Sequence, residues 1–117
     1  MFAGAIEINL GGEGEIPGVI NQLCPWVLTP GWTSSQTRHT LPQLAAAGHV
    51  FLICENLHLP FPDDSVDLVY TNSVPIDRNT HLGPGVQSSE IRRILKPGGR
   101  WVHDGGPANG GHVWTKP

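Results

Sequence analysis

The sequence predicts a single three-layer α/β domain with a mostly parallel sheet of about five strands. With 117 residues, the chain has room for one domain. Two continuous apolar runs, at residues 49–54 (HVFLIC) and 66–71 (VDLVYT), are typical of strands that are buried on both faces. Helical patterns lie at residues 41–48, before the first of these strands, and at residues 86–95, after the second. Strands that alternate with helices indicate a parallel sheet with crossover connections.

The first half of the chain supplies two more strands and one short helix. Residues 5–10 (AIEINL) and 19–23 (VINQL) have strand character, and a glycine-rich loop with a Pro-Gly turn joins them. This connection is so short that the helix expected between parallel strands is missing or reduced to a turn. Residues 25–40 are rich in Pro, Gly, Ser and Thr and read as irregular. The helix at residues 41–48 has a proline in its first turn and ends at a glycine.

The second half contains a long loop, one helix and a last strand. Residues 72–85 form a loop of a length that is usually functional or mobile in a compact domain. The amphipathic helix at residues 86–95 stops at residues 96–99 (KPGG), which we interpret as a breaker. Residues 100–103 (RWVH) begin the last strand. We predict no regular element in the glycine-rich tail from residue 104 onward.

Composition narrows the classes of partner and the compartment. The formal net charge of −3 gives no electrostatic footprint for nucleic acid or an anionic membrane. Cys24 and Cys54 form no CxxC pair, which favours a reducing, cytoplasmic setting. No apolar run reaches membrane-spanning length, and the first ten residues lack the pattern of a signal peptide.

Four loops are expected to meet at one edge of the sheet. In open α/β sheets, ligands bind beyond the carboxyl ends of the strands. The loops that follow those ends are residues 11–17, 55–59, 72–85 and 104–106. We therefore expect any ligand site in this chain to be built from them.

Three motifs carry a resemblance to a known family. Residues 59–69 read LPFPDDSVDLV, residues 90–100 read EIRRILKPGGR, and residues 8–21 read INLGGEGEIPGVIN. Together they resemble the class I S-adenosylmethionine-dependent methyltransferases. The resemblance implies a minimal Rossmann-like methyltransferase fold. Residues 1–58 would be its cofactor-binding half, residues 59–104 would run from the LPFPDD segment to the fifth strand, and residues 105–117 would be a tail.

The resemblance also implies S-adenosylmethionine as cofactor and a set of residues that hold it. Glycines allow backbone N–H groups to approach a ligand closely, and in this family the loop passes under the amino-acid and ribose portions of the cofactor. Glu55 stands where the family has an acidic residue that accepts a hydrogen bond from the adenine amine. A turn without ligand and a solvated strand-end charge are the alternative interpretations of the glycines and of Glu55. The implied cofactor-binding positions are Asn9, Gly11, Gly12, Gly14, Gln22, Glu55, Asn56, Leu57 and Thr71.

The acceptor side is assigned to Asn72, Asp77 and His81. Asn72 follows the fourth strand and would orient an acceptor atom, with turn capping as the alternative role. Asp77 and His81 lie in the loop that follows and would face the acceptor. Asp77, His81, His103 and Asp104 are the candidates for a general base at this edge. The sequence contains six histidines but no HExxH motif, so we expect no metal site.

Two departures from the family keep other functions open. The second strand of the family normally ends in an acidic residue that holds the ribose hydroxyls, and Leu23 occupies that position here, with Gln22 beside it. The chain also lacks recognisable sixth and seventh strands. Two alternatives follow. One is an inactive binding module that dimerises or docks to a larger protein, and the other is the terminal effector domain of a polymorphic toxin.

Overall fold

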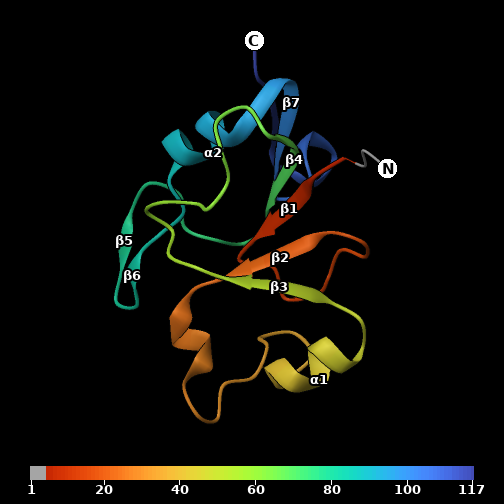
Figure 1. Ribbon diagram of the computed structural model, residues 1–117, viewed down its shortest axis with the longest axis vertical. Coiled ribbons are helices and arrows are strands. Elements are labelled where there is room, and N and C mark those ends of the chain that lie inside the picture. The colour runs from red at the N-terminus through yellow and green to blue at the C-terminus, as the bar shows by residue number, and fades with distance from the viewer. Residues whose placement is uncertain (1–4) are drawn as a thin grey trace.

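The computed structural model describes residues 5–117 and contains one twisted six-stranded sheet with strand order β3-β2-β1-β4-β7-β8 (Figure 1). All neighbouring strands are parallel except β7 and β8, which are antiparallel. The α/β class and the mostly parallel sheet are therefore confirmed, with six strands in place of about five. The strands are β1 (Glu7–Leu10), β2 (Ile20–Leu23), β3 (Val50–Ile53), β4 (Val66–Thr71), β7 (Leu95–His103) and β8 (His112–Thr115).

The strand order reverses at β1. From β1 the chain goes first to β2 and β3 on one side, and later to β4 and β7 on the other. The gap between β1 and β4 at their carboxyl ends is thus a topological switch point, where open α/β sheets bind ligands. The register places Leu10, Thr71 and His103 side by side, so that the residues after them meet at the same edge.

Two α-helices are present in the described chain, and both are shorter than the sequence predicts. Helix α1 (Leu41–Ala46) starts with a capping box between Thr40 and Gln43. Helix α2 (Ser88–Ile94) buries Ile91 and Ile94 in the main core beside β4 and β7. Neither helix is long or apolar enough to cross a membrane, and the same holds for every helix in residues 5–117.

The predicted long loop and tail contain regular structure that the sequence analysis missed. Within residues 72–85, β5 (Asn79–Thr80) and β6 (Gly83–Pro84) form a small hairpin, which projects from the sheet in Figure 1. In the tail, a 3₁₀ turn (η2, Pro107–Asn109) leads into β8. The tail forms a strand because Trp114 and Val113 pair with the apolar residues of β7, whose backbone would otherwise be a free edge.

The helix ends before residues 96–99, as predicted, but the last strand does not begin at residue 100, because β7 starts at Leu95 and continues through these residues. The pairing between β4 and β7 shifts between Val66↔Leu95 and Leu68↔Arg100, so these residues form a bulge inside the strand. The Gly98 N–H donates to the Lys116 carbonyl, and the Lys116 N–H donates to the Gly99 carbonyl. These bonds to the end of the chain satisfy backbone groups that a free turn would expose.

A side-chain staple attaches the LPFPDD segment to α2. Arg93 donates to the carbonyl oxygens of Leu59 and Phe61 at 2.9 and 2.8 Å, and to the carboxylate of Glu90 at 2.8 Å. Glu90 also accepts from the Leu59 N–H at 2.7 Å. The hydrogen bonds from Arg93 hold the pKa of Glu90 below its ordinary value. A segment with no secondary structure of its own is thus fixed by one partly buried ion pair.

Replacing Arg93 by methionine is expected to lower the free energy of unfolding by about 2–4 kcal/mol, because it leaves two carbonyls without their donor and the Glu90 carboxylate without its cationic partner. Urea denaturation measures this. Asp63→Asn is the matched control: Asp63 also binds Arg93, but its side chain is 74% exposed. This change should cost at most about 0.5 kcal/mol. Equal losses in the two variants would contradict the staple.

Candidate functional site

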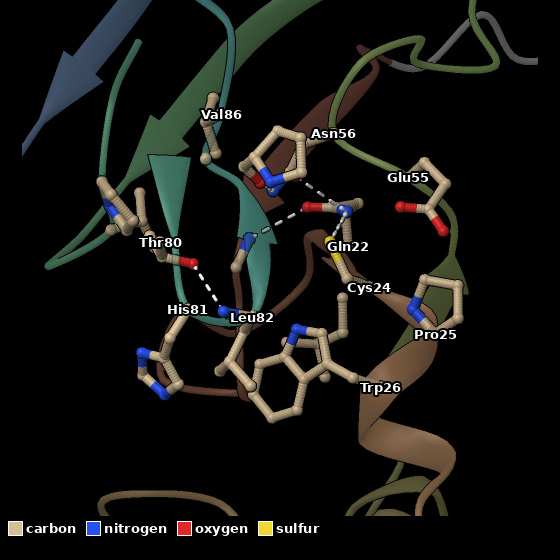
Figure 2. Close-up of a pocket in the computed structure, with 16 residues that line it drawn as sticks. Gln22, Cys24, Pro25, Trp26, Glu55, Asn56, Thr80, His81, Leu82 and Val86 are labelled. Carbon is tan, nitrogen blue, oxygen red and sulfur yellow. Dashed lines mark hydrogen bonds between the residues drawn. The ribbon is translucent and has the colours of Figure 1, made fainter. Parts of the chain in front are cut away.

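A cavity of about 360 Å³ opens at the carboxyl edge of the sheet, between the ends of β2 and β3 and the β5–β6 hairpin (Figure 2). Its volume lies within the range of roughly 300–1,000 Å³ that is usual for small-molecule sites. Its polar lining includes Gln22, Glu55 and Asn56, and its apolar lining includes Trp26 and Leu82. The other lining residues are Gly11, Leu23, Cys24, Pro25, Val74, Pro75, Thr80, His81, Pro84, Gly85 and Val86.

The ends of β2 and β3 present both a charge and an aromatic surface to this cavity. Glu55 follows β3 and is exposed, with no hydrogen bond to the residues described. Trp26 and Leu82 are 40% and 51% exposed, although both are large and apolar. Exposed apolar side chains that converge on a cavity favour a ligand with an apolar ring, and a free carboxylate at its rim favours a hydrogen-bond donor.

Asn56 attaches the hairpin to the sheet. Its side-chain N–H donates to the Pro84 carbonyl at 2.9 Å, which joins the end of β3 to β6. The hairpin carries His81 and Leu82 to the cavity (Figure 2). The predicted site residues Gly11, Gln22, Glu55, Asn56 and His81 are therefore brought together around one space.

Gln22 has a different role from the predicted contact with the cofactor. It is 1% exposed, and its amide N–H groups point to the Cys54 carbonyl at 2.9 Å and to Asn56 Oδ1 at 3.4 Å. Its Oε1 accepts from the Gly11 N–H at 3.1 Å. Both amide protons are thus used within the protein, and Gln22 acts as a strut between the glycine loop and β3. Leu23 is core, at 5% exposure.

The glycine loop adopts conformations that require glycine. Gly11 and Gly14 have φ angles of +69° and +92°, in the region that other residues rarely adopt. A Cβ atom on Gly12 would lie 2.5 Å from Asn21 Oδ1 and 2.7 Å from Asn9 Nδ2. The glycines therefore allow the loop to pack directly on the buried amides of β1 and β2.

The N–H groups of this loop are engaged within the protein. Gly12 donates to the Asn9 carbonyl at 3.1 Å, and Gly14 donates to Asn21 Oδ1 at 3.3 Å. With Gly11 bound to Gln22, the predicted backbone donors are not directed at a ligand. In place of backbone donors, the loop can offer a ligand its side chains and the close approach of a backbone without Cβ atoms.

Glu15 is a charged residue of this edge that the sequence analysis did not select. Its carboxylate accepts from Asn9 Nδ2 at 2.7 Å, from the Glu13 N–H at 2.9 Å and from Asn72 Nδ2 at 3.2 Å. Partial desolvation raises the pKa of Glu15, but these hydrogen bonds outweigh it and keep the pKa below its ordinary value. The sequence did contain a signal for this residue, because Glu13 and Glu15 lie in a glycine-rich loop directly after a predicted strand.

The remaining predicted residues lie outside the cavity. Thr71 is fully buried, accepts from Trp101 Nε1 at 2.9 Å and lies 2.8 Å from His103 Nδ1. Asp77 accepts from the backbone N–H of Ser88 at 2.8 Å and from its hydroxyl group, so it caps α2 and does not face the cavity. Leu57 is 59% exposed and does not line the cavity.

His103 contributes to a second, apolar cavity of about 280 Å³ on one face of the β7–β8 pair. Trp101, Trp114, Ile76 and His112 complete its lining. Among residues 5–117, no group of three or more His, Cys, Asp or Glu side chains could hold a metal ion.

Comparison with known proteins identifies the family. The family model described as a methyltransferase domain matches residues 32–103. The chain belongs to the methyltransferase-domain family. The matched segment begins after η1 (Pro25–Leu28) and runs through β7, so it includes Glu55, Asn56 and the hairpin but not the glycine loop.

Two curated relatives match the same fraction of this methyltransferase domain. The mitochondrial 2-methoxy-6-polyprenyl-1,4-benzoquinol methylase of Mus musculus is 42% identical over 62 residues, which are 53% of this chain and 18% of that protein. Probable methyltransferase PMT21 of Arabidopsis thaliana is 40% identical over 62 residues, 53% of this chain and 10% of that protein. The chain thus spans less than a fifth of the length of either relative.

One solved structure resembles most of the chain. It belongs to a complex of the Haloferax volcanii Trm112 methyltransferase activator with a proposed methyltransferase. It has a TM-score of 0.49 and 21% identity, and the likeness covers 86% of this chain and 44% of that one.

Replacing Gln22 by methionine, which has a similar shape, is expected to lower the free energy of unfolding by about 1–3 kcal/mol, because it leaves the Gly11 N–H and the Cys54 carbonyl without partners. Urea denaturation measures the loss. Gln36→Met, at an exposed position, is the control and should change stability by less than about 0.5 kcal/mol. A Gln22 variant as stable as the control would contradict the strut.

Glu15→Gln is expected to show a stability loss that depends on pH. Because the folded-state pKa of Glu15 is lowered, the ionised carboxylate stabilises the fold above about pH 4.3, the ordinary value for glutamate. This contribution disappears as the pH falls through the lowered folded-state pKa. The variant should therefore be about 0.5–1 kcal/mol less stable at pH 7, the range for an exposed charged group, and this gap should be smaller at pH 3. Urea curves at both pH values measure the gap, and a gap of the same size at both would contradict the role of the charge.

Proposed function

We propose that this domain binds S-adenosylmethionine and serves as the donor-binding part of a methyltransferase, with the acceptor left unnamed. Membership in the methyltransferase-domain family supports the reaction class. The observation that carries the cofactor is the cavity in which Glu55, Asn56 and Trp26 converge beside Gly11 at the carboxyl edge.

The residues present fit the adenosine portion of this cofactor. The Glu55 carboxylate has free acceptor atoms for the exocyclic amine of adenine, and a carboxylate forms a stronger hydrogen bond than a neutral acceptor. Trp26, Leu82 and Val86 supply apolar surface for the ring. The bare backbone of Gly11 lines the same space. Because Leu23 is core, the ribose would be held without the carboxylate that the family normally supplies at that position.

In this proposal each residue has a separate task. Bound S-adenosylmethionine supplies a methyl group that is activated by a positively charged sulfur. Gln22 fixes the loop against β3, and Asn56 fixes the hairpin, so that both walls of the cavity are held before the ligand arrives. Asn72 and His81 are the polar side chains that we assign to the acceptor side. Methyl transfer depends mainly on alignment, which such a rigid edge can provide.

Binding of the cofactor tests the proposal directly. Titration calorimetry of the purified chain with S-adenosylmethionine is expected to show micromolar affinity, and Glu55→Gln should weaken it about 5- to 30-fold, because a charge-assisted hydrogen bond is lost. Glu7→Gln makes the same change of charge at the opposite, amino end of β1 and is the matched control.

The outcomes separate the parts of the proposal. Equal affinity of Glu55→Gln, Glu7→Gln and the wild type would remove Glu55 from the site. No binding by the wild type at millimolar ligand would overturn the proposed function, and the interaction-module alternative would take its place.

A further inference from the structure

The switch point between β1 and β4 carries a negative charge that is held in place. Glu15 lies on the loop that leaves β1, and its carboxylate is joined to Asn72, the first residue after β4. Gly11, which lines the cavity, is the first residue after β1. Glu15 is not part of the lining of that cavity, so a ligand whose ring lies beside Glu55 would have to extend past Gly11, toward Asn72, to approach the Glu15 carboxylate.

The hydrogen bonds of Glu15 orient it for this position. Asn9 is fully buried, and its Nδ2 donates to Glu15, while its Oδ1 has no hydrogen-bond partner. A buried oxygen without a hydrogen-bond partner destabilises the fold, so Asn9 at this position requires an explanation, which its hydrogen bond to Glu15 supplies. The residue Glu15 itself is exposed, so a ligand can reach its carboxylate. The low pKa of that carboxyl group keeps it ionised at neutral pH.

We propose that Glu15 is the counter-charge for the cationic methionyl end of the cofactor and gives the domain a preference for S-adenosylmethionine over S-adenosylhomocysteine. This inference rests on the proposed function. The donor carries a positive sulfur that the product lacks, whereas the adenosine, ammonium and carboxylate groups of the two ligands are the same. A fixed negative charge at the switch point therefore distinguishes the two ligands by charge alone.

The other carboxylates nearby cannot take this role. The Glu13 carboxylate is occupied by Ser35, because its Oε1 accepts from both the N–H and the hydroxyl group of that residue. Glu55 lies at the end of β3, two strands away from β1. Asp104 is tied to the Ser73 N–H at 2.7 Å and follows β7, one strand beyond β4.

Calorimetric titration of the wild type, Glu15→Gln and Glu13→Gln with both ligands tests the proposal. The wild type is expected to bind S-adenosylmethionine more tightly than S-adenosylhomocysteine, and Glu15→Gln should reduce the ratio of the two affinities about fivefold, the upper range for an exposed charge pair. Glu13→Gln removes the same charge from the same loop and should keep the wild-type ratio. Urea denaturation of each variant confirms that it is folded.

The result that overturns the proposal is a Glu15→Gln variant whose affinities for both ligands fall by the same factor, since this is the effect of a merely structural residue. Binding of neither ligand by the wild type would overturn the proposed function as well. The wild type provides a second test that needs no variant. Raising the ionic strength should weaken S-adenosylmethionine binding and leave S-adenosylhomocysteine binding nearly unchanged, because salt screens the charge. An equal dependence on salt would also overturn the proposal.

Discussion

The hydrogen bonds of the Gln22 side chain are the constraint on which the candidate site depends. One buried amide joins the loop after β1, through the Gly11 N–H, to the end of β3, through the Cys54 carbonyl. Asn56, which also contacts Gln22, continues the connection to Pro84 in the hairpin. A buried amide is costly unless its groups are paired, and a fully paired one makes its surroundings rigid. Both walls of the cavity are therefore held by a single connected network.

The same network explains how two adjacent parallel strands are joined without a helix. Parallel neighbours are normally linked by a crossover of a dozen or more residues, usually helical. Here residues 11–19 return to the start of β2 as a loop, and the buried amides of Asn9 and Asn21 take the place of helical packing beneath it. The absence of a Cβ on Gly12 is what permits this contact. Polar side chains of β1 and β2 thus hold the connection against the sheet, as apolar contacts of a crossover helix do in other parallel sheets.

The parts of the structure that follow from local pattern could be predicted, and those that depend on distant partners could not. The local sequence predicts the apolar strands β3 and β4 and the short connection between β1 and β2. Strand β8 was missed because it forms only against the edge of β7. Asp77 was wrongly assigned to the acceptor side, because its hydrogen bond with Ser88 joins residues eleven positions apart and cannot be seen in the local sequence. Glu15 was overlooked because its contact with Asn72 spans 57 positions. The family motifs located Glu55 and Asn56. No pattern in residues 20–23 (INQL), however, shows that the amides of Asn21 and Gln22 are buried.

The missing helix also changes the electrostatics of the switch point. A helix that starts there would direct about half a positive charge toward the ligand, an arrangement that favours phosphates and other anions. In this chain the loop N–H groups are used within the protein, and the charge that the loop brings to the ends of β1 and β4 is the carboxylate of Glu15. An edge of this kind disfavours a nucleotide phosphate and favours a ligand that is cationic at the end lying over β1 and β4. S-adenosylmethionine has an uncharged adenosine for the cavity and a positive sulfur for the switch point. The distribution of charge along the edge therefore agrees with the proposed cofactor independently of the family-model match, because that match does not include the glycine loop.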